Sequence, residues 1–352
     1  MDQTECYDVT IIGGGPAGLF ASFYSGLRNL KTKIIEYQPH LGGKIHVYPE
    51  KMIWDVGGLK PLSGAQLIEQ LTEQGLTFNP TVVLNEKIAK ISKREDGVFV
   101  LMNSNEEVHY SKTVIVATGS GILNPQKLEI EGAERFEISN LHYTIPSYKQ
   151  FQDKVVLVSG GRDAAIDIAL ELEEIAKKVY LIYRKDQLVG HEAQVDKLLN
   201  SSVTCLFDTV ISTLRSVDNH TISQVELQNN IDNTFKTIDV DEVVINHGFE
   251  RDASIIQNSD ISIELIDDFY IACDNKSASS VEGLYAAGDI LYNDSKVHLI
   301  LGTFQDATNA VNSAKKYLEP DAEATAMVSS HNDVFKERNQ ALVHSMLKKA
   351  EC

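Results

Sequence analysis

The sequence predicts an α/β fold with two Rossmann-like domains, the second inserted into the first. Two observations carry this prediction. A unit of strand, glycine-rich turn, helix and strand occupies residues 9–36, and a second such unit occupies residues 154–185. A unit of this kind places the phosphates of a dinucleotide at the amino end of its helix. Its repetition therefore predicts two nucleotide sites, one in each domain.

The first unit begins with the β-branched run Val9–Ile12, which predicts a buried strand. Residues 13–18 follow as a G-x-G-x-x-G turn, and a helix is expected over Leu19–Leu30. A second strand, Lys33–Ile35, ends on Glu36, which stands 23 residues after the first glycine (36 − 13). An acid at this place accepts hydrogen bonds from the hydroxyls of an adenosine ribose.

Each glycine of this turn has a physical role. Gly13 permits the tight turn, Gly15 lets the backbone approach a pyrophosphate, and Gly18 allows helix and strand to pack closely. Pro16 and Ala17 complete the turn, at the start of the helix whose unpaired N–H groups face the phosphates.

Residues 37–60 are punctuated by Gly and Pro and predict a loop along the bound dinucleotide. Tyr48 is the aromatic residue best placed in this loop to lie flat on a flavin ring. Ser63–Gln74 predicts an amphipathic helix with Ser63 as its N-cap. An antiparallel insertion is then expected, with strands at 81–91, 97–102 and 108–112. A buried strand, Thr113–Val116, follows and ends in a turn of small residues.

The second unit follows an expected linker at 121–150. Its strand, Lys154–Ser159, leads into a glycine turn, a helix is expected through Ala176, and the strand Val179–Tyr183 ends on Arg184 and Lys185. Cations in place of the acid suit a 2′-phosphate, which favours NADP over NAD.

Arg162 stands where the second turn would carry its next glycine. Two interpretations remain open. Its Cβ hinders the approach of the backbone to a pyrophosphate, or its guanidinium itself binds a phosphate.

The rest of the chain completes both domains. Strand-like segments between Val203 and Ile245 close the inserted domain near Gly248. Glu282–Asp289 then predicts a buried strand that ends on Gly-Asp, where the aspartate can form a hydrogen bond with a ribityl hydroxyl of a flavin. A long helix is expected at 299–317 and a short amphipathic helix at 334–349. The expected domains are 1–120 with 249–352, and 121–248.

Composition excludes several classes of function. The net charge of −18 argues against nucleic acid and anionic membranes as partners. No apolar run approaches the roughly 20 residues that span a bilayer, and the acidic N-terminus leads straight into a strand, so the cytoplasm is expected. The four cysteines form no C-x-x-C, which predicts no metal, no iron–sulfur cluster and no local redox disulfide.

The chain resembles the flavoprotein reductases that contain two dinucleotide-binding folds, on the motifs IIGGGPAG, VIVATG and GLYAAGD. Within them it looks most like the thioredoxin-reductase-like ferredoxin–NADP reductases of bacteria, on YPEKMIWDVGG, LHY at 141–143 and the extended tail. Thioredoxin reductases carry C-x-x-C after the second glycine turn. This chain reads DAAIDIAL there, so electrons cannot leave through a protein dithiol.

The resemblance implies one FAD per subunit and NADPH as co-substrate. Tyr48 would stack on one face of the flavin. In this family a tail histidine from the partner subunit of a homodimer often covers the other face. Counting forward from Pro320 puts Val328 there, and His331 fits with a shift. The predicted FAD residues are Gly13, Gly15, Pro16, Ala17, Gly18, Glu36, Gly43, Lys44, Tyr48, Asp55, Ile88, Ala117, Gly119, Leu123, Asp289 and Ser330. The predicted NADP residues are Gly160, Gly161, Arg162, Asp163, Ala164, Arg184 and Lys185.

The expected activity is hydride transfer from NADPH to flavin N5, followed by one-electron transfer to ferredoxin or flavodoxin, with no catalytic side chain beyond the flavin. Such acidic carriers would need a local basic patch on this acidic chain, with Lys44, Lys51 and Lys60 as candidates. Two alternatives remain: an NAD(P)H-dependent reductase of quinone, oxygen or another acceptor, and an FAD-binding regulatory protein whose nicotinamide site has decayed through Arg162.

Overall fold

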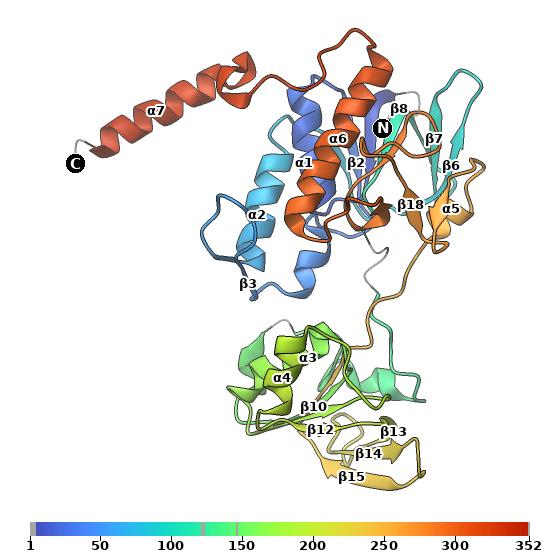
Figure 1. Cartoon of the computed structure of the whole chain (residues 1–352), viewed down its shortest axis with the longest axis vertical. Helices are drawn as coiled ribbons and strands as arrows, with labels where there is room; N and C mark the ends of the chain where they lie inside the picture. Colours follow the sequence, from blue (N-terminus) through green and yellow to red (C-terminus); the bar gives the residue numbers. More distant parts are fainter. Residues whose placement is uncertain (1–4, 120, 122–123, 146, 351–352) are drawn as a thin grey trace. The chain divides into compact units, whose positions relative to one another are not determined.

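The computed structural model describes residues 5–119, 121, 124–145 and 147–350, and these form two compact units (Figure 1). Unit 1 comprises Met1–His46, Lys51–Ile122 and Arg251–Cys352, and unit 2 comprises Val47–Glu50 and Leu123–Glu250. Each unit is built on a sheet with parallel strands and helices on its face. The predicted α/β class with two Rossmann-like domains is confirmed.

The main sheet of unit 1 runs in the order β5-β2-β1-β8-β7-β6, with β19 pairing with β8. Parallel pairing joins β5, β2, β1, β8 and β19, and antiparallel pairing joins β6, β7 and β8. The strands are β1 (Cys6–Ile12), β2 (Thr32–Ile35), β5 (Thr81–Val83), β6 (Ile88–Lys93), β7 (Phe99–Asn103), β8 (Val108–Val116) and β19 (Leu284–Ala286).

The structure corrects the expectation of two separate strands at 108–112 and 113–116. They are one strand, β8, that changes its partner halfway along. Its first half pairs antiparallel with β7 and its second half pairs parallel with β19, while β1 follows the other edge. The first half is mostly half-buried because it belongs to a solvated antiparallel ribbon, and the second half is buried on both faces. Because the pattern of polar and apolar residues changes where the burial changes, the sequence predicted a boundary between two strands at this point.

The start of the expected antiparallel insertion is also corrected. Residues 81–83 form β5, which lies parallel to β2 and extends the nucleotide-binding sheet, and the antiparallel ribbon begins only at β6. Asn85, with a left-handed φ of +59°, separates the two strands. Two strands in one alternating run cannot be separated by periodicity alone.

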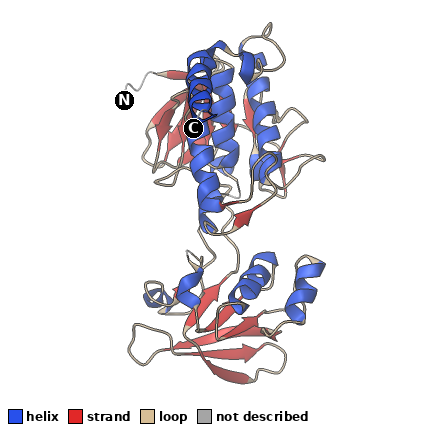
Figure 2. Cartoon of the chain, turned by 90° about the vertical axis from the view of Figure 1, so that its left-hand side faces the viewer, coloured by secondary structure: helices blue, strands red, loops and turns tan. Residues whose placement is uncertain are grey.

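Three helices lie side by side on one face of the main sheet of unit 1 (Figure 2). They are α1 (Pro16–Leu27), α2 (Gly64–Gly75) and α6 (Ile300–Leu318). Alanines of α1 and α6 let both helices approach the strands closely, in a cluster with Val9, Ile11 and Ile115. α1 starts and ends three residues earlier than expected, and Asn29, at φ +54°, lies just beyond its end.

The prediction for α2 is confirmed in detail. Ser63 is its N-cap, its hydroxyl accepts from the Gln66 N–H at 3.3 Å, and the Gln66 side chain accepts from the Ser63 N–H at 2.9 Å. This capping box satisfies two backbone donors that the first turn of a helix leaves unpaired.

The opposite face of the main sheet is covered by smaller elements around Phe99, Ile271 and Leu291. These elements are the short helix α5 (Ser254–Gln257) and a small sheet of β17 (Leu265–Ile266), β18 (Tyr270–Ala272) and β20 (Leu291–Tyr292). A two-stranded pair, β3 (Met52–Ile53) and β4 (Leu62–Ser63), brackets the loop before α2.

Unit 2 has a parallel sheet of order β12-β11-β10-β16-β9. Helices α3 (Asp163–Glu173) and α4 (Glu192–Leu199) cover one face, and an antiparallel sheet covers the other. The expected linker at 121–150 contributes β9 to the sheet, and α3 ends three residues before Ala176. The strands are β9 (Leu141–His142), β10 (Val155–Ser159), β11 (Lys178–Ile182), β12 (Thr204–Leu206) and β16 (Glu242–Ile245), with β13 (Thr209–Arg215), β14 (Gln224–Asn229) and β15 (Phe235–Asp239) in the antiparallel sheet.

The tail after α6 crosses the carboxyl end of α1. Its Ala326 N–H donates to the Tyr24 hydroxyl at 3.2 Å, and the Phe335 ring packs against both Phe23 and Phe78. The last helix, α7, spans Lys336–Ala350, so the tail helix expected at 334–349 is confirmed with its start shifted by two residues. Among the described residues, no helix has the length and apolar character to cross a membrane.

Candidate functional site

The glycine turn of unit 1 lies where β1 ends and α1 begins. Gly15 is the N-cap of α1, no side chain caps this helix, and Pro16 occupies its first turn. Leu19 N donates to Gly15 O at 2.9 Å and closes the first turn. The N–H groups before it and the positive end of the helix dipole are therefore available to an anion.

Two of the three glycines are required by the protein itself. Gly13 has a φ of +109°, and a Cβ there would come within 2.3 Å of Ala117 O. A Cβ on Gly18 would come within 1.9 Å of Gly13 O. Gly15 is different, because its Cβ would meet only Gly43 Cα at 3.6 Å. Apart from Gly43 and the neighbours of Gly15 in the chain, no described residue comes within 4 Å of this Cβ position, which leaves the close backbone approach that a pyrophosphate requires.

Glu36 follows the carboxyl end of β2, and backbone N–H groups of the glycine turn and of its own loop hold its carboxylate in place. Its Oε2 accepts from Gly14 N at 2.6 Å and its Oε1 accepts from Gln38 N at 2.7 Å. The residue is 8% exposed. A carboxylate has about four acceptor positions, so two remain after these bonds. The carboxylate is fixed in place and still able to accept from two ribose hydroxyls.

Three segments far apart in sequence meet this turn. Gly43 packs on Gly15, where a Cβ would come within 2.7 Å of Gly15 Cα. Ala117, at the end of β8, lies against Gly13 as described above. Gly288 begins the short helix η4 (Gly288–Ile290), and a Cβ there would lie 3.0 Å from Ala17 Cβ. Asp289 is thereby brought to the amino end of α1. This arrangement of an uncapped helix, fixed acid and uncrowded glycine fits the adenosine diphosphate portion of FAD.

The remaining predicted FAD residues are spread more widely. Lys44 lies in the turn η1 (Gly43–Val47), Gly119 follows β8, Ile88 is buried at the start of β6, and Asp55 is exposed in the loop after β3. Tyr48 is grouped with unit 2. Leu123 lies outside the described residues. Ser330 and His331 are exposed in η5 (Ser329–His331), on a tail whose described contacts lie at the far end of α1 from its glycine turn.

The second glycine turn, in unit 2, is packed by its own neighbours. A Cβ on Gly160 would come within 2.4 Å of Asn246 O, and one on Gly161 would enter the Tyr183 ring at 2.2 Å. Both glycines are thus explained by packing within unit 2. Arg162 is the N-cap of α3 with an extended backbone (φ −110°), so its position does not require glycine. Its side chain is exposed, and no side chain caps α3.

The loop before α4 closes over this turn, which the sequence did not predict. Val189 N donates to Gly161 O at 2.8 Å, and His191 N donates to Asp163 Oδ1 at 2.7 Å. Asp163 therefore anchors a loop, and its predicted contact with NADP stays a prediction. Ala164 is exposed in the first turn of α3.

Cationic side chains gather at the end of β11. Arg184 and Lys185 are exposed just beyond the strand. Across the turn, Ser159 Oγ lies 2.9 Å from His247 Nε2. His247 is exposed as a whole residue, but desolvation of its ring, and then the positive charge of Arg184, lower its pKa below the ordinary value. His247 was missed because it follows β16, some 60 residues from Arg184 in sequence. An uncapped helix beside exposed cations suits the phosphates of NADP.

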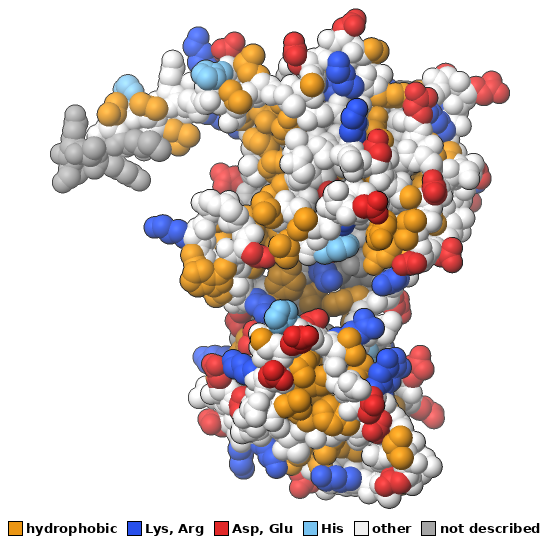
Figure 3. All heavy atoms as spheres, in the orientation of Figure 1, with side chains coloured by type: hydrophobic (Ala, Val, Ile, Leu, Met, Phe, Trp, Pro, Cys, Tyr) orange, Lys and Arg blue, Asp and Glu red, His pale blue; other side chains and the backbone are white. Residues whose placement is uncertain are grey.

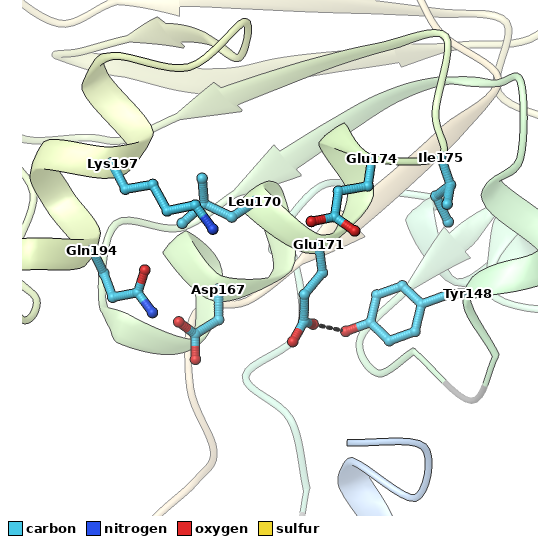
Figure 4. A pocket seen from close by; sticks show the side chains of 8 residues that line it. All are labelled: Tyr148, Asp167, Leu170, Glu171, Glu174, Ile175, Gln194 and Lys197. Atoms are coloured by element: carbon cyan, nitrogen blue, oxygen red, sulfur yellow. Dashed lines mark hydrogen bonds between the residues drawn. The ribbon is translucent and has the colours of Figure 1, made fainter. Parts of the chain in front are cut away.

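A separate pocket lies along α3 and α4 of unit 2, in a cavity of about 350 Å³. The Tyr148 hydroxyl donates to Glu171, and Asp167, Glu174 and Lys197 also line it (Figure 4). Burial, and then this carboxylate, raise the pKa of Tyr148 far above its ordinary value. Its lining carries three carboxylates and one lysine, which does not suit a phosphate, and none of the predicted nucleotide residues lines it.

Charge is mixed on the face of the molecule that Figure 3 shows. On the face seen in Figure 3, lysine and arginine side chains are interspersed with aspartate and glutamate, and the described residues there form no field of one sign. A partner that docks through charge would therefore meet small local groups of lysines.

Comparison with known proteins assigns the chain to a family. The profile of the pyridine nucleotide-disulphide oxidoreductase family matches residues 7–314. The chain is 62% identical over 349 residues to ferredoxin–NADP reductase 1 of Bacillus mycoides, covering 99% of this chain and 100% of that protein. It is also 62% identical over 348 residues to ferredoxin–NADP reductase 2 of Exiguobacterium sibiricum, covering 99% of each.

Solved structures show the same fold at lower identity. Thioredoxin reductase of Lactococcus lactis matches with a TM-score of 0.74 and 24% identity, over 89% of this chain and 99% of that one. Thioredoxin reductase of T. acidophilum matches with a TM-score of 0.73 and 21% identity, over 90% and 99%. The resemblance drawn from the motifs is confirmed, and the chain belongs to the pyridine nucleotide-disulphide oxidoreductase family.

Proposed function

We propose that the chain is a ferredoxin–NADP reductase, with FAD in unit 1 and NADPH as the electron donor at unit 2. The observation that carries the proposal is its 62% identity, over nearly the full length of both chains, to proteins of that name. Two uncapped helix ends, each behind a glycine turn, support it. When bound, FAD accepts a hydride and gives up its two electrons one at a time.

Unit 1 supplies binding and orientation. The N–H groups at the start of α1 bind the pyrophosphate, Glu36 accepts from the ribose hydroxyls, and Asp289 accepts from a ribityl hydroxyl. Lys44, Asp55 and Ile88 complete the part of the site that unit 1 provides, and Tyr48, which is grouped with unit 2, is the residue proposed to stack on the flavin. The contacts that bring Glu36, Gly43 and Gly288 to the glycine turn at the start of α1 support the roles proposed for the pyrophosphate and ribose portions.

Unit 2 supplies the binding of NADPH. The start of α3 binds the pyrophosphate, and Arg184 and Lys185 bind the 2′-phosphate. The Arg184 guanidinium can form two parallel hydrogen bonds to a phosphate, and the Lys185 ammonium attracts it as a point charge. Arg162 adds a third cation at the turn, which its exposed side chain supports. This role makes Arg162 compatible with a working nicotinamide site.

Electrons leave the protein from the flavin. Helix α3 carries no cysteine, so a dithiol relay at the place where thioredoxin reductases have one is absent from this helix. Cys6, Cys205 and Cys273 are free thiols, as is usual in the reducing cytoplasm, where we place the protein. The acceptor is ferredoxin or flavodoxin, and the lysines 44, 51 and 60 offer it local positive charge.

We further propose a homodimer. Leu342, Val343 and Leu347 of α7 are more than half exposed, and apolar side chains in one helix favour a protein partner. The contacts of the tail with Tyr24 and Phe23 hold it at the carboxyl end of α1. A flavin contact from Ser330 or His331 then comes from the tail of the second copy.

Acceptor competition tests the proposal. The purified protein, loaded with FAD, is given NADPH together with ferredoxin, flavodoxin, a quinone or oxygen, and the rate of each reduction is measured. Ferredoxin or flavodoxin reduction at a kcat/KM well above that of quinone and oxygen is the expected result. Equal rates with quinone, and no saturable reduction of either protein, would assign the chain to a different reductase.

A further inference from the structure

A buried ion pair lies beside the proposed flavin site. Lys296 Nζ pairs with Asp306 Oδ2, and their side chains are only 2% and 14% exposed. Lys296 stands in the turn before α6, and Asp306 stands in the second turn of that helix. Burying two such charges is costly, so a pair of this kind needs further bonds to its partners to be tolerated.

The same carboxylate oxygen holds the segment that carries Asp289. Asp306 Oδ2 accepts from Gly288 N at 3.2 Å, and Gly288 opens the short helix η4 at a φ of +79°. Ser277 Oγ donates to the backbone oxygen of Asp306 at 3.0 Å, so a further segment is fixed to the same place. Asp306 thus joins α6, η4 and the turn at residue 277.

Lys296 neutralises Asp306 close to a second acid. Asp289 is the next residue after Gly288, whose N–H donates to the Asp306 carboxylate, so an unpaired Asp306 would add a second negative charge at the segment that carries Asp289. Lys296 removes this repulsion, while Asp306 keeps its oxygen aimed at the Gly288 N–H. The lysine and the aspartate are ten residues apart in sequence (306 − 296) and belong to no sequence motif.

We propose that Asp306 is a positioning residue for the flavin: it fixes the Gly288–Asp289 turn through the Gly288 N–H, and Lys296 supplies the charge that lets it do so. The inference rests on the proposed function, because it gives FAD as the occupant. It adds two residues that act through Asp289 and touch neither nucleotide.

Two double variants separate positioning from stability. K296M/D306N keeps an acceptor for the Gly288 N–H, and K296M/D306L removes it. Neither variant leaves a buried unpaired charge, so both apoproteins are expected to fold with similar Tm. K315M/E319Q is the control, because it removes a pair at the carboxyl end of the same helix, where the Glu319 side chain is 60% exposed.

The measurement is FAD affinity of each apoprotein, by quenching of flavin fluorescence, with the Tm recorded with and without FAD. K296M/D306N and the control should bind within about threefold of wild type. K296M/D306L should bind about tenfold or more weakly, as the loss of one buried hydrogen bond predicts, and should lose most of the rise in Tm that FAD gives.

Equal FAD affinity of the two double variants would overturn the positioning role, and so would a fall in apoprotein Tm with an unchanged FAD affinity. A wild-type apoprotein that binds no FAD would instead contradict the proposed function. The two failures are therefore distinguishable.

Discussion

Replacing Gly15 with alanine separates phosphate binding from folding. The φ of Gly15 is −77°, which any residue adopts. A Cβ at Gly15 would meet only Gly43 Cα at 3.6 Å, an ordinary van der Waals contact. Gly15→Ala should therefore change the folding free energy of the apoprotein by no more than about 1 kcal/mol.

The effect on the cofactor is expected to be much larger. The same Cβ projects into the space proposed for the pyrophosphate, and it pushes the phosphate away from the N–H groups at the start of α1. Loss of one charge-assisted hydrogen bond is worth about 1.5–3 kcal/mol. FAD affinity should then fall by about tenfold to a hundredfold.

Gly18→Ala is the matched control within the same turn. Its Cβ would come within 1.9 Å of Gly13 O, so the backbone must move. Overpacking of this kind costs about 1–3 kcal/mol, and occasionally more, whether or not FAD is present. Urea unfolding of each apoprotein and flavin fluorescence titration give both quantities.

If Gly15→Ala binds FAD as tightly as wild type, the pyrophosphate does not occupy the space beside Gly15. The same conclusion follows if Gly15→Ala destabilises the apoprotein as much as Gly18→Ala does, since the space beside Gly15 would then be filled by the protein and not by a ligand.

Glu36→Gln replaces a charged acceptor with a neutral amide, which weakens the hydrogen bonds from two backbone N–H groups and from the ribose hydroxyls. FAD affinity should therefore fall at least about tenfold in the flavin fluorescence titration. R184A/K185A raises the KM for NADPH severalfold and leaves the KM for NADH unchanged, and an equal rise for both would contradict the 2′-phosphate assignment. Ser63→Ala removes a capping box and should cost about 1 kcal/mol in urea unfolding with steady-state kinetics unaltered. His247 has a lowered pKa when folded, so the unfolded chain takes up its proton first and wild-type stability falls as pH drops below about 6.5. H247Q should lose less stability than wild type over that range, and identical pH profiles would show that His247 does not contribute.

The local parts of the site could be predicted from the sequence. The turn at 13–18 and Glu36 depend on one strand–helix–strand unit, and contiguous residues carry all of its information. The α2 capping box, Ser63 with Gln66, was partly visible for the same reason, since a helix start is set within four residues. Asp289 could be placed because a buried strand that ends on Gly-Asp is a short pattern.

The parts that the sequence did not predict depend on contacts between separate elements, which no single local pattern records. The single strand β8 looked like two because β7 and β19, which divide its outer edge, lie on either side of it in the chain. Asp163 was expected to bind a nucleotide, and its bond to His191 became visible only with the loop in place. The pair Lys296–Asp306 follows no helical or strand period, because one partner lies in a turn.

The most direct measurement is an anaerobic titration of the FAD-loaded protein with NADPH, followed by absorbance of the flavin. We predict that about one equivalent of NADPH per FAD bleaches the flavin band and that oxidised ferredoxin restores it. A flavin that stays oxidised while NADPH is in excess would contradict the account, because the two nucleotide sites would then not work together.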